Sequence, residues 1–149
     1  HRQMARDLRI WTLTGDLGYG MLDFIRRDYP DRFLNCGASE QAMVGIAVGM
    51  AHEGIKPFVY SITPFLLYRP FEVIRNYINH ESVPVRLVGS GYRHDYAHDG
   101  FSHHPDEQEE VLRLWPNITS VFPQTKEELP DLVARVVDEN KPWYINLRR

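Results

Sequence analysis

Short apolar runs alternate along the chain with longer segments in which apolar residues recur every three or four positions. The short runs predict β-strands and the longer segments predict helices. The expected strands are Ile10–Thr14, Arg32–Asn35, Pro57–Ser61, Val83–Gly89, Thr119–Phe122 and Trp143–Leu147. The expected helices are roughly Gly20–Tyr29, Ser39–Glu53, Phe65–His80, Pro105–Leu114 and Lys126–Glu139. This order predicts an α/β fold: a three-layer α/β/α sandwich with a mostly parallel sheet.

The expected helix at Ser39–Ala51 carries no charge after its first turn. A helix that is apolar on all sides has no face for water and should be covered all round. Its small residues Ala42, Gly45 and Gly49 would let another backbone approach closely. We therefore expect part of its surface to form a subunit or domain interface. The alternative is a helix buried wholly in the core of its own chain.

The segment from Gly89 to Pro105 has the opposite character. It is long and polar, it follows the most apolar strand, and it holds four of the seven histidines. In open α/β sheets, ligands bind at the carboxyl ends of the strands. The segment is therefore a candidate for substrate contacts.

Composition narrows the class of protein. The 149 residues suit a single domain, and 43% hydrophobic residues can build a core. A net charge of -3 gives no reason to expect nucleic acid as a partner, and no apolar run is long enough to span a membrane. The single cysteine, Cys36, excludes an internal disulfide. These features are typical of a cytoplasmic protein.

Glu40 stands out among the carboxylates. Ser39 can cap the helix that follows, and a carboxylate in the first turn is stabilised by the helix dipole. That structural role explains most glutamates in such a position. Because the rest of the helix is apolar, however, Glu40 should lie at the edge of a dry region. A carboxyl group there can exchange protons near neutral pH.

Phe65, Tyr68 and Phe71 follow a predicted strand at helical spacing. The spacing fits simple core packing. It also fits a platform on which a flat ring could stack.

A metal site is the other possibility for the polar loop. The residues that could act as zinc ligands are His94, Asp95, His98, Asp99, His103 and His104. Their spacing matches no standard zinc motif, so from the sequence we assign no metal and expect solvated or substrate-binding histidines. The chain also lacks a Gly-x-Ser-x-Gly elbow, a phosphate-binding loop and a dinucleotide fingerprint.

Several segments, in this order, resemble the pyrimidine-binding domain of transketolase and of 1-deoxyxylulose-5-phosphate synthase. The glutamate segment is the most diagnostic of them. The matching segments are Gly15–Leu17, Pro30–Gln41, Gly45–Ala51, Gly54–Phe58, Pro64–Phe71, Asp99–His104 and Trp115–Ile118. The resemblance covers most of the chain, from about Gly15 to Leu129, and it implies a thiamine diphosphate-binding fold.

The resemblance implies that Glu40 is catalytic. In such enzymes a glutamate contacts N1′ of the cofactor's aminopyrimidine ring and promotes loss of the thiazolium C2 proton. Phe65 and Tyr68 would line the pyrimidine pocket, and Asp16 would lie near the thiazolium. Asp99 and His103 would face the substrate, and His103 would also be catalytic.

The sequence departs from the family pattern in three places. Ser102 stands where a threonine is common, and Tyr92–His98 is richer in histidine than the usual glycine-rich loop. Gly18–Gly20 lacks a serine that helps to bind sugar phosphates in typical transketolases. These differences bear on the choice of substrate.

The family holds magnesium and diphosphate through Gly-Asp-Gly followed by a later Asn, and this chain contains no such motif. We therefore expect a diphosphate-binding domain or partner subunit to hold most of the magnesium. The resemblance also implies an active site shared between chains, in a homodimer or heterotetramer.

The leading hypothesis is two-carbon ketol transfer on a small-molecule ketose or oxoacid. The alternatives are a component of a thiamine-dependent decarboxylase or of a deoxyxylulose-phosphate-type synthase, and a module that kept the fold without catalysis.

Overall fold

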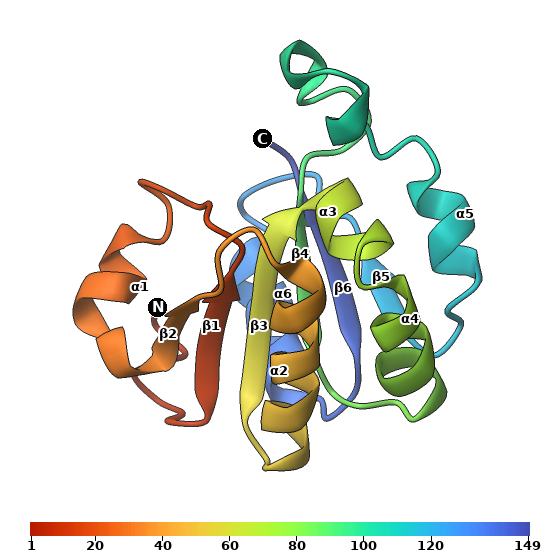
Figure 1. Cartoon of the computed structure of the whole chain (residues 1–149). Coiled ribbons are helices and arrows are strands. Elements are labelled where there is room, and N and C mark those ends of the chain that lie inside the picture. Colours follow the sequence, from red (N-terminus) through yellow and green to blue (C-terminus); the bar gives the residue numbers. More distant parts are fainter.

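The computed structural model describes all residues from His1 to Arg149 (Figure 1). Its strands are β1 (Ile10–Thr14), β2 (Phe33–Asn35), β3 (Lys56–Ile62), β4 (Arg86–Ser90), β5 (Thr119–Val121) and β6 (Trp143–Leu147). Its α-helices are α1 (Asp23–Asp28), α2 (Glu40–His52), α3 (Thr63–Tyr68), α4 (Phe71–Val73), α5 (Gln108–Arg113) and α6 (Leu129–Asp138). None of the helices has the length and apolar character needed to cross a membrane.

The six strands form one fully parallel sheet in the order β2-β1-β3-β4-β6-β5. Helices α2, α3 and α4 cover one face, and α6 covers the other (Figure 1). The larger core lies beneath α2, where Leu13, Val59 and Leu87 of the sheet meet Met43 and Ala47 of the helix. The predicted three-layer α/β/α sandwich is confirmed.

The predicted boundaries of one helix and one strand differ from the structure, in each case near a proline. The single helix expected at Phe65–His80 starts earlier, at Thr63, and is divided into α3, α4 and a π-helical segment at Ile74–His80. The break between α3 and α4 falls at Pro70, which lacks a backbone N–H and cannot sit inside a regular helix. The strand expected from Val83 begins only at Arg86, because Pro84 likewise cannot donate a sheet hydrogen bond.

The direction in which the sheet is built reverses beside Glu40. From β1 the chain moves outward to β2, and α2 then brings it back across β1 to β3 on the other side. This reversal between β1 and β3 is the topological switch point, where the carboxyl ends of strands in open α/β sheets bind ligands. Helix α2 begins at that edge of the sheet (Figure 1).

Candidate functional site

The Glu40 carboxylate lies at the switch point, and the residue is 2% exposed. Ser61 at the end of β3 donates a hydrogen bond to Oε1 at 3.1 Å. Gly15, directly after β1, also lies against this oxygen: a Cβ there would be 3.1 Å from it. Ser39 occupies the N-cap position as expected, but its side chain makes no capping hydrogen bond.

Arg69 is the partner that the sequence did not predict. Its Nη1 donates to Glu40 Oε2 at 2.6 Å, while almost half of the arginine side chain remains exposed. The guanidinium and the Ser61 hydroxyl therefore place a positive charge and a hydrogen-bond donor against the buried carboxyl group. The dry surroundings expected for Glu40 are confirmed, and the structure adds a counter-ion. A clue was available, because Arg69 is the first charged residue after Lys56.

The aromatic ring of Phe65 connects this ion pair to the polar loop. The Arg69 guanidinium lies 4.0 Å from the Phe65 ring centroid, and the His103 ring meets Phe65 edge-on at 4.8 Å. His103 Nδ1 lies 3.1 Å from the Ser102 hydroxyl. Phe65 and His103, which are far apart in sequence, are therefore neighbours at the same edge of the sheet.

The other two aromatic residues have different surroundings. The Tyr68 hydroxyl donates to Glu107 Oε2 at 3.3 Å, and burial together with the Glu107 charge raises the pKa of Tyr68 to about 12. Phe71 packs against Trp115 at 5.1 Å, and both Tyr68 and Phe71 lie against the main core. Core packing therefore accounts for both side chains, and Phe65 is the one of the three whose ring contacts Arg69 and His103.

Asp16 lies in the turn after β1, next to the glycine that touches Glu40. Its backbone is in the left-handed region, with φ of 57°, which is uncommon for a residue other than glycine. The Asn35 side chain stabilises this turn by accepting from the Asp16 N–H at 3.0 Å. Hydrogen bonds from the Tyr19 hydroxyl and from Asn35 lower the pKa of the Asp16 carboxyl. The side chain is therefore held as an anion at neutral pH.

A buried hydrogen-bond network fixes the start of the polar loop. Thr63 donates to the Gly91 carbonyl at 2.7 Å, and the Asn146 amide donates to the same carbonyl at 3.0 Å and to Thr63 Oγ1 at 2.9 Å. Gly89 must be glycine, because a Cβ there would approach the Tyr144 hydroxyl to 2.6 Å. The network ties β4, α3 and β6 together, so the loop leaves the sheet in a defined direction.

Asp99 is exposed on this loop, whereas His103 is half-buried. Its carboxylate pairs with His98 Nε2 at 3.1 Å and lies 4.0 Å from an Arg149 guanidinium nitrogen. Asp95 forms a two-pronged ion pair with Arg148, with both distances at 2.9 Å. The ion pair and hydrogen bonds therefore connect the loop to the end of β6.

Comparison with known proteins decides the family. All residues from 1 to 149 match the family described as "Transketolase, pyrimidine binding domain". The chain belongs to this family. Relatives include a subunit of an apulose-4-phosphate transketolase from Phocaeicola vulgatus, 31% identical over 99% of the chain and 48% of the relative. A 1-deoxy-D-xylulose-5-phosphate synthase from Clostridium botulinum is 32% identical over 89% of the chain and 21% of the relative.

Solved structures agree with this assignment. A split-gene transketolase, described as an inactive beta4 tetramer, superposes with a TM-score of 0.84 at 27% identity, over 99% of this chain and 47% of that one. The transketolase of Leishmania mexicana gives the same TM-score at 22% identity and shows the shared fold, over 97% of this chain and 23% of that one. This pyrimidine-binding domain spans less than half the length of these relatives.

The apolar helix α2 of this family member is not wholly buried. Its inner face, including Met43, Val44 and Ala47, is in the core. Its outer face exposes an uncharged stripe of small and apolar residues, and Ile46 is 43% exposed. The members of this stripe are Ala42, Gly45, Ile46 and Gly49. The alternative of a helix buried entirely within its own chain is therefore wrong.

Proposed function

We propose that this chain supplies the pyrimidine-binding half of a thiamine diphosphate-dependent transketolase-type active site, with Glu40 activating the cofactor. The observation that carries the proposal is the buried Glu40 carboxylate, set at the switch point of the sheet. The reaction proposed is transfer of a two-carbon ketol unit. Relatives named as transketolase and as deoxyxylulose-phosphate synthase both support the thiamine-dependent class.

The residues of the site fit the cofactor's aminopyrimidine ring. Glu40 offers a buried carboxyl group, and Phe65 offers an aromatic ring against Arg69, the partner of Glu40. When bound, thiamine diphosphate supplies an electron-accepting thiazolium for carbon–carbon bond cleavage and formation. The protein's part is to orient the cofactor and to handle protons.

Glu40 is assigned the proton-handling step. Its carboxyl group would hold a proton at ring nitrogen N1′ in a site from which water is largely excluded. Ser61 fixes the direction of Oε1, while Oε2 is engaged by Arg69. The Arg69 side chain is half exposed and so has room to rotate away from Glu40. This rotation would leave Oε2 available to the cofactor's aminopyrimidine ring. Asp16 is assigned to the turn near the thiazolium, and Tyr68 to the edge of the pyrimidine pocket.

Diphosphate and magnesium are assigned to another domain or subunit. The chain carries no Gly-Asp-Gly…Asn motif, and a similar relative is itself named as one subunit of a transketolase. We propose that the exposed α2 stripe packs against a second chain, in a homodimer or heterotetramer. In such a shared site, Glu40 would come from this chain and the groups that hold the diphosphate from the other domain or subunit.

Calorimetry tests whether another domain or subunit is needed to hold the diphosphate and magnesium. Thiamine diphosphate with magnesium should bind the chain alone only weakly, because ring stacking and one carboxyl contact remain without the diphosphate contacts. Adding a diphosphate-binding subunit should tighten binding and allow turnover of ketose donors. Tight, magnesium-dependent binding by the chain alone would contradict this arrangement. Turnover of 2-oxoacids without ketoses would favour the decarboxylase or synthase alternative.

His103 and Asp99 are proposed to bind substrate hydroxyls. The His103→Ala substitution removes a hydrogen-bonding group that typically contributes about 0.5–1.5 kcal/mol. In the assembled enzyme it should lower kcat/KM about 2- to 12-fold while cofactor affinity is unchanged, as measured by steady-state kinetics and calorimetry.

His103→Gln is the matched variant, because it keeps a hydrogen-bonding side chain and should recover part of the loss. Weaker cofactor binding in both variants would instead place His103 against the cofactor.

A further inference from the structure

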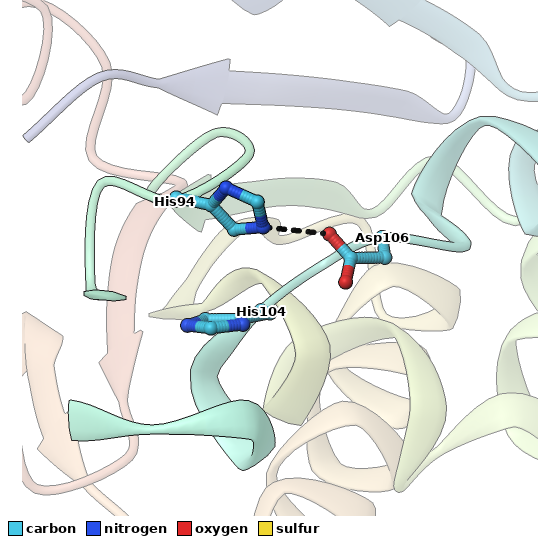
Figure 2. A group of neighbouring side chains, drawn as sticks. All are labelled: His94, His104 and Asp106. Atoms are coloured by element: carbon cyan, nitrogen blue, oxygen red, sulfur yellow. Dashed lines mark ion pairs between the residues drawn. The ribbon is translucent and has the colours of Figure 1, made fainter. Parts of the chain in front are cut away.

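Folding of the polar loop gathers three side chains of the types that bind metals, and they are not part of the proposed thiamine site. They are His94, His104 and Asp106, and one ligand atom from each lies within 4.8 Å of the other two (Figure 2). The spacing of these residues in the sequence does not predict a metal site. Asp106 also lies outside the set of possible zinc ligands that the sequence suggests. The loop brings the set together because His94 precedes two 3-10 turns, Ala97–Asp99 and Phe101–His103, and the other two residues follow them.

The distances are close to those of a bound ion. In a tetrahedral zinc site with ligands at about 2.0–2.1 Å, neighbouring ligand atoms are about 3.3 Å apart. His94 Nε2 and Asp106 Oδ1 already have that separation, at 3.3 Å. The His94 and His104 ring centroids lie 4.7 Å apart. Small side-chain rotations of His104 would bring the third ligand into range.

The chemistry of the three residues favours a transition metal over a simple ion pair. Two imidazoles and one carboxylate form a ligand set used for zinc and for iron, whereas magnesium and calcium prefer oxygen ligands. His104 Nε2 is shielded from solvent and has no hydrogen-bond partner, which leaves the His104 ring only partly satisfied. Binding a metal through one ring nitrogen would offset part of the cost of burying this side chain.

We propose that His94, His104 and Asp106 bind a divalent transition metal, with zinc as the best fit. The bound metal would cross-link the two ends of the loop. Three protein ligands leave one tetrahedral position for water. The cross-linked segment would run from His94 to His104, and it contains Asp99 and His103. Closing a loop with a metal lowers the number of its open conformations. The metal would therefore order the part of the chain to which substrate contacts are assigned.

Zinc titration of the chain without cofactor tests the proposal. Calorimetry should show one zinc ion per chain, and cobalt in its place should give the visible absorption of a four-coordinate site. The variants His104→Ala and Asp106→Asn should each weaken binding at least as much as the roughly 10–100-fold that loss of a supporting contact costs at metal sites. Zinc should also slow proteolysis within the loop in the wild-type chain but not in these variants.

The matched control is His98→Ala. His98 lies in the same loop and pairs with a carboxylate, Asp99, at 3.1 Å, but it belongs to no group of three ligands. Its removal should leave zinc affinity and stoichiometry unchanged. The proposal is overturned if zinc does not bind, or if its affinity falls with His98→Ala and not with His104→Ala. Circular dichroism of each variant checks that the fold is retained.

Discussion

Glu40→Gln should slow exchange of the cofactor's C2 proton by about 10²–10⁴-fold in the assembled enzyme, the range typical of a general acid–base group. Glutamine has nearly the same shape but cannot exchange a proton with ring nitrogen N1′. The residue is 2% exposed, so water cannot easily replace its carboxyl group. The measurement is hydrogen–deuterium exchange at C2, followed by NMR after acid quench.

Arg69→Gln separates loss of the carboxyl group from loss of its ion pair. It removes the 2.6 Å contact with Oε2 but leaves the carboxyl group in place. Exchange should fall much less than in Glu40→Gln. The fold should survive in both variants, because Ser61 can still hydrogen-bond the side chain at position 40. A near-normal rate of C2 proton exchange in Glu40→Gln would contradict the proposed catalytic role of this residue.

Gly49→Glu should break the proposed assembly. Gly49 lies in the uncharged stripe on α2, and its Cβ position has no heavy atom within 4 Å in this chain. The isolated chain should therefore fold normally, with glutamate more favourable than glycine inside a helix. In an interface the carboxylate would lose its water, which costs several kcal/mol when no partner compensates. Subunit affinity should fall roughly 100-fold or more, as measured by light scattering across a dilution series.

Asn140→Glu provides the control for an added charge. Asn140 is exposed and follows the C-terminal end of α6, the helix on the opposite face of the sheet from α2 (Figure 1). Assembly should persist in this variant. If the wild-type chain is monomeric at micromolar concentration even with its partner present, the stripe is not an interface.

The sequence by itself determined most of the fold. Ile10–Thr14 and Trp143–Leu147 were predicted to the residue, and the alternation of strands and helices predicted the parallel sheet. These features are local: the period of apolar residues differs between a strand and a helix, and each segment carries its own pattern. The sequence also singled out α2 as a helix too apolar to be left uncovered.

The predicted helix boundaries differ from the structure where two local preferences compete. The apolar period continues through Phe65–His80, but Pro70 removes one backbone donor within it. The periodic pattern predicted one helix, and the covalent structure of proline divided it. The helical segments on both sides of Pro70 remain packed in the fold. Helix α3 packs on β4, and α4 and the π-helical segment pack on α2.

Only the tertiary structure decided which side chains meet. Arg69 pairs with Glu40 across 29 residues, and His94 approaches Asp106 across a loop of two 3-10 turns. Likewise, only the packed sheet showed that one face of α2 is buried while the stripe with Gly49 is open. Such contacts depend on strand order and loop direction, which local periodicity does not encode. The sequence therefore predicted Glu40 as a candidate, and the fold supplied its counter-ion and its position at the switch point.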